Sequence, residues 1–450
     1  MKKVCAIGIC IVLWLTAVLL PVSAVSYTLP EDMKLSAKSA IFVSLGATPE
    51  ADTVLYERDA DTPRAPAAML RMMVGCYAVK LIREQSLDTD TVTGTYTLAC
   101  DNIITGTGLG TANLKIGDVW TLKDMLTVSM METAADACVT MAVTLSGSVE
   151  AFVAGMNEMA QEIGCENTVF VNVTGLDAAG QYTTARDMMK ITRRAMEYPE
   201  LVEMLSQPQY KVKPVKGAEQ VRANSNGMIR TITDSYYRRL SFGRTGFTDN
   251  AGRCMAAVAQ DNGYEYLAVV MGCAKEDGSD YALAHYEDMR ALCEWGFSNF
   301  TYKTLISKNQ PVTQLSVDLA WSRDTLPLVA ETDFSTIVEK NLDPSTVRVV
   351  PVLDQQGAVD APIEKGTAYG KAELYINIDQ KIGEVTLIAG ESLERSDVLA
   401  LWRSFRAFLA SPWLYIILGL LLVMIAAYII LSILHNRRRR RYKGGPRLRR

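Results

Sequence analysis

One charged side chain stands alone in a long apolar stretch of the chain. Arg71 is the only charge between Arg64 and Lys80, among Ala, Met, Leu and Val residues. A guanidinium in such surroundings must either reach solvent or bind a buried partner, because an unpaired buried charge is costly. The sequence leaves both readings open: a side chain that extends to the surface, or a charge held inside a site.

The remaining residue types argue against two common kinds of active site. The chain has two histidines, His285 and His435, so a Ser-His-Asp triad or a zinc site would rest on His285 alone. Seven cysteines lie outside the leader described below, without a CxxC pair or close metal-ligand spacing. Their odd number and apolar surroundings favour buried thiols over a disulfide framework. No metal ion and no cofactor is expected.

Both ends of the chain carry membrane signals. Two lysines, an apolar core and the small residues Val22-Ser23-Ala24 predict a secretory signal peptide over residues 1–24. A retained amino-terminal anchor is the alternative. Residues 413–434 contain no charge and are long enough to span a bilayer. The basic tail, residues 435–450, is predicted to be cytoplasmic by the positive-inside rule, which leaves the rest of the chain outside the cytoplasm.

Acidic and basic residues are divided unevenly between the predicted ectodomain and the tail. The whole chain has 46 Lys and Arg against 50 Asp and Glu. Without two basic residues in the leader and nine in the tail, 35 basic residues face 50 acidic ones, a balance of −15. An acidic ectodomain argues against nucleic acid as a partner. The tail suits membrane orientation and contact with anionic lipid.

The ectodomain is too long for a single typical core, so two domains are predicted. In the first, residues 30–300, Pro66 precedes a buried helix that is apolar on all sides. A second apolar helix is expected over Leu122–Leu145, and Asp261-Asn262-Gly263 predicts a hairpin. Strands near both ends of this domain, with helices between them, predict an antiparallel sheet covered by helices, an α/β (α+β) fold.

The pattern of predicted secondary structure changes after residue 300. Short strand-like runs alternate with turns over residues 301–390, which predicts a small all-β domain. Over residues 396–411, apolar residues recur at helical spacing with Arg403 and Arg406 between them. This pattern predicts an amphipathic helix that lies on the membrane surface or simply links the β domain to the span.

The stretch Pro66-Ala67-Ala68-Met69-Leu70-Arg71 resembles the Pro-Ala-Ser-x-x-Lys opening of the D-alanyl-D-alanine carboxypeptidases, the low-molecular-mass penicillin-binding proteins. In that family the Ser is acylated and the Lys, one helical turn further on, prepares it. Here Ala68 stands at the Ser position and Arg71 at the Lys position. The residues around the motif therefore match the family, but the serine and the lysine that carry out its chemistry are replaced.

Two later stretches continue the resemblance in the same order. The family's Ser-x-Asn motif falls on Thr133 and Ala135, and the following Asp136-Ala137 matches well. Its Lys-Thr-Gly motif appears as Arg244-Thr245-Gly246. In the family this strand holds the terminal carboxylate of the substrate, and an arginine fork suits a carboxylate. Arg244 is therefore interpreted as a substrate-binding cation, or alternatively as the partner of a surface acid.

The resemblance implies the penicillin-binding-protein and β-lactamase-like fold, followed by a small β-rich domain and a membrane helix. It does not imply activity. Acyl transfer needs an attacking atom and a group that takes its proton, and Ala68 and Arg71 supply neither. Thr133 is a conceivable substitute nucleophile, but nothing evident would deprotonate it. Arg71 is expected to bind a carboxylate or hydroxyl in the old site, from Glu132, Asp136 or Thr133.

Three functions remain open at the level of the sequence. The first is an inactive protein that binds peptidoglycan stem peptides or regulates an active penicillin-binding protein. The second is an active carboxypeptidase that uses the substituted residues. The third is a structural partner in the cell envelope whose groove is vestigial. In the first case Thr245 and Gly246 would contribute a hydroxyl and an open strand edge to peptide binding.

Overall fold

The computed structural model describes residues 27–216, 218–274, 282–355, 357–376 and 380–442. The predicted signal peptide and the end of the basic tail lie outside the described residues. The chain divides into two compact units. The first comprises the chain up to Lys303 together with Ile337–Leu342, and the second comprises Thr304–Thr336 and the chain from Asp343 onward.

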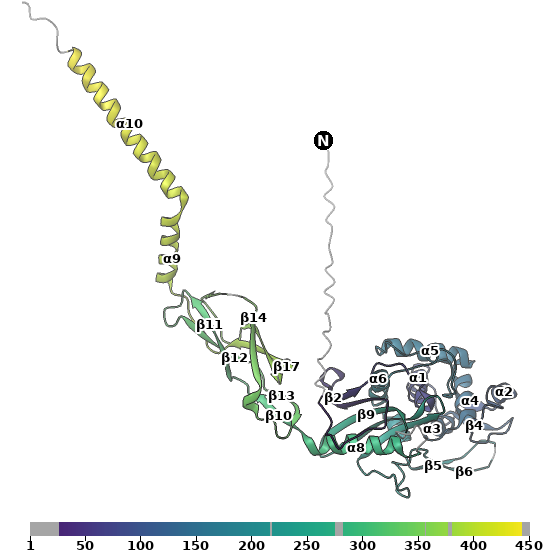
Figure 1. The fold of residues 1–450 in the computed structure, drawn as a ribbon. Helices are drawn as coiled ribbons and strands as arrows, with labels where there is room; N and C mark the ends of the chain where they lie inside the picture. Colours follow the sequence, from purple (N-terminus) through teal and green to yellow (C-terminus); the bar gives the residue numbers. More distant parts are fainter. Residues whose placement is uncertain (1–26, 217, 275–281, 356, 377–379, 443–450) are drawn as a thin grey trace, which may run out of the picture. The chain divides into compact units, whose positions relative to one another are not determined.

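In the described part of the first unit, five strands form one antiparallel sheet (Figure 1). The order across the sheet is β2 (Thr53–Arg58), β1 (Ser39–Ser44), β9 (Tyr264–Cys273), β8 (Gly252–Asp261) and β7 (Leu240–Thr248). Strands from the two ends of the predicted domain thus lie side by side, and the predicted antiparallel sheet is confirmed. Strand β7, which carries Arg244-Thr245-Gly246, forms one edge.

The predicted hairpin is confirmed between β8 and β9. Its two central residues, Asn262 and Gly263, have φ angles of 49° and 83°. Asn and Gly are the residues that accept such left-handed backbone most readily, and two positive φ angles in succession characterise the tight hairpin turn. The turn therefore fixes the register of the two central strands.

The alternation of side chains along the strands creates two cores. On β1, Ile41 and Val43 belong to a core shared with α1 (Arg71–Glu84) and the other helices of that face. Phe42 points the opposite way, into a second core formed with α8 (Ala284–Asn299). The sheet is therefore covered by helices on both faces.

The remaining helices of the first unit are α2 (Leu98–Ile104), α3 (Leu122–Met131), α4 (Ala135–Ser146), α5 (Val149–Glu162), α6 (Ala185–Ala195) and α7 (Pro199–Ser206). Two short ribbons pair β3 (Thr93–Thr95) with β4 (Val119–Thr121) and β5 (Gln209–Val212) with β6 (Gln220–Ala223). The prediction of one continuous helix over Leu122–Leu145 is wrong. Glu132, with φ −118° and ψ 172°, is extended and ends α3.

The second unit is β-rich. Its larger sheet has the order β14 (Arg348–Leu353), β16 (Ala368–Ile376), β17 (Gln380–Ala389), β12 (Thr325–Ala330), β11 (Pro311–Asp318) and β15 (Val359–Asp360). A further ribbon pairs β10 (Phe300–Ile306) with β13 (Phe334–Glu339), and the residues of these two strands are divided between the first and second units. Buried leucines such as Leu328, Leu374 and Leu387 form the core of this unit.

Two helices follow the β strands. Helix α9 (Asp397–Ala410) has no buried residue and is separated by Ser411 from α10 (Pro412–Tyr442). Within α10, an 18-residue stretch of Pro412–Arg438 has a mean hydropathy of 3.0, and the segment is long and apolar enough to cross a membrane. Among the described residues, this is the one straight helix with that property.

The seven cysteines of the described chain are free thiols. Six of them, Cys76, Cys100, Cys138, Cys254, Cys273 and Cys293, are buried, and Cys165 is partly buried. Burial raises the pKa of Cys76 and of Cys165 to about 12. The thiols therefore belong to the core, as their apolar surroundings indicated.

Candidate active-site groove

Ala68 lies in a short 3₁₀ turn, Ala67–Leu70, that leads directly into α1. Two glycines approach the backbone of this turn closely. A Cβ atom on Gly246 of β7 would come within 2.9 Å of the Ala68 nitrogen, and one on Gly175 would come within 2.5 Å of the Ala67 carbonyl oxygen. Glycine at both positions therefore lets β7 and the loop around residue 175 lie against the backbone beside Ala68.

Arg71 is buried, with 1% of its surface exposed. Its Nε and Nη2 atoms donate to the Thr174 carbonyl oxygen at 3.3 and 3.2 Å, and its Nη1 atom donates to the Glu132 carbonyl oxygen at 3.1 Å. Extension to the surface is thus excluded. The prediction of a carboxylate or hydroxyl partner is also wrong, because all three hydrogen bonds go to backbone carbonyls.

Arg244 is the second buried guanidinium, also 1% exposed. It donates to the carbonyl oxygens of Met130 at 2.7 Å and Glu132 at 2.8 Å, and more weakly to that of Ala68 at 3.4 Å. Burial and the nearby charge of Arg71 lower the pKa of Arg244 to about 9, which leaves it protonated at neutral pH. Burial also lowers the pKa of Arg71.

This geometry changes the interpretation of Arg244. The alternative that it pairs with a surface acid is wrong, because the side chain is buried and its partners are backbone oxygens together with the Ser225 hydroxyl. The predicted role as a carboxylate ligand would require the guanidinium to leave those oxygens. The sequence could not show this, since the acceptors come from three separate backbone segments.

The break between α3 and α4 supplies the shared acceptor of the two arginines. The Glu132 carbonyl oxygen accepts from both Arg71 and Arg244. Beyond the break, the Ala135 nitrogen donates to the Gly110 carbonyl oxygen. The end of a helix leaves carbonyls without intrahelical donors. The two guanidiniums satisfy such carbonyls here and thereby hold the break in one conformation.

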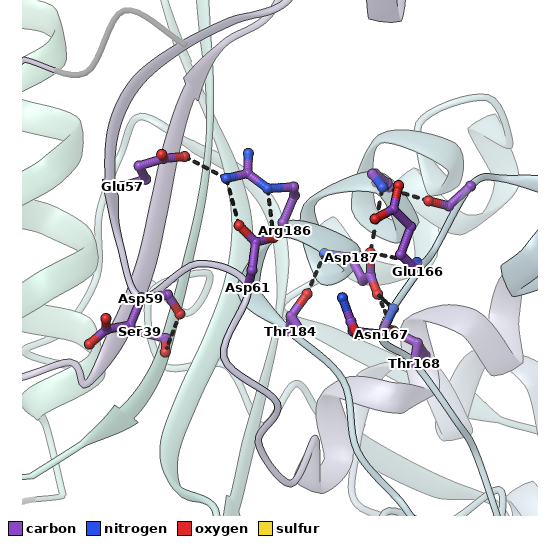
Figure 2. A network of polar contacts seen from close by, with 12 residues as sticks. Ser39, Glu57, Asp59, Asp61, Glu166, Asn167, Thr168, Thr184, Arg186 and Asp187 are labelled. Carbon is purple, nitrogen blue, oxygen red and sulfur yellow. Dashed lines mark hydrogen bonds and ion pairs between the residues drawn. The ribbon is translucent and has the colours of Figure 1, made fainter. Parts of the chain in front are cut away.

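The loop that supplies the Thr174 carbonyl is itself held by side-chain hydrogen bonds. At its start, the Asp187 carboxylate accepts from the Asn167 nitrogen and from the Thr168 hydroxyl, both at 2.8 Å (Figure 2). Further along, the Asn172 side-chain oxygen accepts from the Thr174 nitrogen at 3.1 Å. The acceptor of Arg71 is therefore a fixed backbone position rather than part of a loose loop.

These elements enclose a groove of about 370 Å³. The structure brings Ala68, Arg71, Thr133, Thr245 and Gly246 together at this groove, as the sequence predicted. Arg244 and Ala135 lie behind it, fully buried. The other lining residues are Gly108, Leu109, Gly110, Thr174, Gly175, Ser225, Phe247, Thr248, Arg253, Ala282, His285 and Tyr286.

Comparisons with known proteins agree with this arrangement. The family model described as D-alanyl-D-alanine carboxypeptidase matches residues 26–275, which is more than half of the chain. The chain belongs to the D-alanyl-D-alanine carboxypeptidase family. A second model, described as the C-terminal domain of penicillin-binding protein 5, matches residues 300–395, in the β-rich unit.

Curated relatives and solved structures extend the comparison. D-alanyl-D-alanine carboxypeptidase DacF of Bacillus subtilis is 27% identical over 353 residues, 78% of this chain and 82% of the relative. DacD of Escherichia coli is 28% identical over 336 residues, 73% of this chain and 81% of the relative. The fold resembles the crystal structure of DacD from Francisella tularensis, with a TM-score of 0.65 and 19% identity over 82% of this chain and 96% of that one. It also resembles penicillin-binding protein 5 from Haemophilus influenzae, with a TM-score of 0.60 and 22% identity over 82% of this chain and 100% of that one.

Within this carboxypeptidase family, the reaction begins with acylation of a serine. The groove of this member offers an alanine methyl at that position and a guanidinium, the side chain of Arg71, one turn further on. The hydroxyls of Thr133 and Thr245 remain, and the described residues that line the groove include the imidazole of His285 but no carboxylate and no lysine. Ala68 and Arg71 thus replace the serine hydroxyl and the lysine of the family's acylation step.

Sequence reasoning missed several residues on the outer side of the groove. Arg253, at the start of β8, pairs in register with Phe247 of β7, and its guanidinium lies 4.0 Å from the centre of the Phe247 ring. The Tyr286 hydroxyl accepts a hydrogen bond from the Gly227 nitrogen at 2.8 Å. Only the strand register, which the sequence alone does not give, places Arg253 opposite Phe247 and beside the groove.

Proposed function

We propose that this chain is a membrane-anchored protein of the cell envelope that binds peptidoglycan stem peptides without cleaving them. The observation that carries the proposal is the groove itself. Its nucleophile position is Ala68, and its base position, Arg71, is locked onto backbone carbonyls, yet a space of about 370 Å³ with threonine hydroxyls on its wall persists. Regulation of an active penicillin-binding protein through the same groove is the related alternative.

The charges around the groove support a carboxylate ligand. Arg71 lines the groove and Arg244 lies directly behind it, and no acidic side chain in the described structure hydrogen-bonds either guanidinium. Arg253 adds a third cation on the outer side. An anionic peptide terminus gains from such a field, particularly at low ionic strength.

A stem-peptide analogue that ends in D-Ala-D-Ala should bind more tightly than the same peptide with a C-terminal amide. We expect high micromolar to millimolar affinity for the acid, about −4 to −6 kcal/mol, because the Ser and Asn positions are Ala68 and Ala135. Calorimetric titration of the detergent-solubilised chain measures the difference. Arg253→Gln should reduce the preference for the acid, whereas Arg323→Gln, an exposed arginine of the second unit, should not.

The outcomes separate the competing functions. Equal affinity for acid and amide would refute carboxylate recognition, and absence of binding to both would favour a structural role with a vestigial groove. Because Arg244 donates to three backbone carbonyls, Arg244→Ala tests stability together with binding. Arg253→Gln is therefore the cleaner variant for this question.

Membrane attachment is the second part of the proposal. Helix α9 ends one residue before the apolar helix α10, and its exposed residues Val398, Leu401, Trp402, Phe405, Phe408 and Leu409 share one face at helical spacing. On the opposite face, Arg403 pairs with Asp360 of β15. This arrangement turns the apolar face away from the β strands, as a helix lying on a bilayer requires.

Protease added to spheroplasts should digest the chain up to about residue 410 and spare the arginine-rich end of α10. The reason is that the basic residues that follow the apolar segment favour the cytoplasmic side. Antibodies against epitope tags at each end of the mature chain measure the fragments. Loss of the carboxy-terminal tag before the membrane is permeabilised would reverse the proposed orientation.

A further inference from the structure

A second groove shares Phe247 with the Ala68 groove. Its volume is about 460 Å³. The residues around it include two cations, Lys38 and Arg64, and one acid, Asp249. The predicted catalytic positions Ala68, Arg71 and Thr133 do not line it. The function proposed above therefore makes no use of this space.

Arg64 is held in place from its backbone outward. Its backbone nitrogen donates to the Thr183 carbonyl oxygen at 2.8 Å, and the Thr183 nitrogen donates back to the Arg64 carbonyl oxygen at 2.9 Å. Its Nε atom donates to the Ser39 hydroxyl at 2.6 Å. The buried Ser39 hydroxyl in turn donates to the Asp59 carbonyl oxygen at 2.7 Å (Figure 2).

This relay orients the outer end of the guanidinium. With Nε turned inward to Ser39, the two Nη atoms form the free end of the planar fork. Within the described residues, neither Nη atom of Arg64 has a protein acceptor at hydrogen-bond distance. A pre-oriented guanidinium that lines a groove and has two unpaired donors offers the geometry that carboxylates and phosphates bind in two-point fashion.

The second cation is positioned by glycine. Gly272, with φ 69°, is the next-to-last residue of β9 and lines the groove. A Cβ atom there would lie 3.2–3.4 Å from the Cβ, Cγ and Cδ atoms of Lys38. The absence of a side chain at residue 272 thus lets the Lys38 stem lie along the strand. Lys38 is exposed, so its ammonium group is accessible to a ligand. Asp249 is also exposed and leaves the groove with a net positive charge.

We infer that this second groove is a binding site for an oxyanion, a carboxylate or a phosphate group, with Arg64 as the two-point ligand and Lys38 as the supporting charge. Nothing in the carboxylate proposal for the Ala68 groove is required for this inference. Either source of the anion, a free phosphate or the carboxylate of an acidic small molecule, presents the same pair of oxygens to Arg64.

Titration of the full-length chain in detergent micelles with inorganic phosphate, and separately with glutarate, tests the inference. We expect saturable binding of at least one of them in the millimolar range, measured against sodium chloride at equal ionic strength. Arg64→Gln should weaken binding by about tenfold or more, because it removes a charge-assisted pair of hydrogen bonds. Preference for phosphate or for glutarate identifies the source of the anion.

Three further variants keep the test independent of folding. Lys38→Glu changes an exposed residue and should weaken binding by about tenfold or more, through charge reversal. Ser39→Ala keeps the Arg64 charge but removes its orienting partner, so we expect a loss of about threefold. Arg323→Gln, a remote change of the same charge, should leave binding unaltered. Absence of saturable binding, or equal binding by wild type and Lys38→Glu, would overturn the inference.

Discussion

A fluorescent penicillin should leave no covalent label on the purified chain. Acylation requires an oxygen at residue 68 and a group that accepts its proton, whereas the structure has an alanine methyl and the guanidinium of Arg71, which is a very weak base, there. In serine hydrolases, loss of the nucleophile lowers turnover by about 10⁶-fold. Intact-mass spectrometry after incubation with the drug measures the adduct directly.

Two variants show which missing group matters. Ala68→Ser alone should remain essentially unlabelled, because Arg71 cannot take the proton of the new hydroxyl. Ala68→Ser combined with Arg71→Lys should label at least about 100-fold faster, since general-base assistance contributes about 10²–10⁴. An adduct on the wild-type chain that maps to Thr133 or Thr245 would contradict the assignment of this groove as non-catalytic.

Replacement of Arg71 by Met should lower the free energy of unfolding by about 1–3 kcal/mol. The substitution removes three hydrogen bonds and leaves the carbonyls of Thr174 and Glu132 with fewer donors in a buried site. Urea denaturation of the ectodomain measures the change. The matched control is Arg83→Met, in the same helix, whose exposed pair with Glu200 predicts a loss below about 1 kcal/mol.

The two buried arginines should not act independently. Arg244→Met is expected to destabilise the chain by a similar amount, because Arg244 donates to the carbonyls of Met130 and Glu132. The double variant should cost more than the sum, by about 0.5–3 kcal/mol, because only the double variant leaves the Glu132 carbonyl without a guanidinium donor. Additive losses, or unchanged melting for Arg71→Met, would show that the shared acceptor is energetically unimportant.

The sequence predicts the scaffold of the site better than its internal contacts. The order of Ala68, Thr133 and Thr245 within matching surroundings indicated that these residues meet, and the structure places all three at one groove. The hairpin at Asn262-Gly263 followed from local turn chemistry. Such features depend on short stretches whose conformation is set by the residues themselves.

The partners of the arginines could not be predicted in this way. The run Leu122–Leu145 contains neither Gly nor Pro, so nothing local indicates that it breaks at Glu132. Once it breaks, carbonyls become available, and they outcompete the carboxylates that the sequence suggested for Arg71. Arg253 could not be predicted as a groove residue either, because its place beside Phe247 depends on the register of β7 and β8.

The central claim is that the groove binds a D-Ala-D-Ala peptide without cleaving it, and one measurement tests it directly. The purified chain is incubated with a stem-peptide analogue at a concentration that nuclear magnetic resonance shows to be bound, and released D-alanine is quantified against an active carboxypeptidase. We predict saturable shifts of the peptide signals and recovery of the intact peptide. Release of D-alanine that penicillin abolishes, or the absence of any bound peptide, would contradict the account.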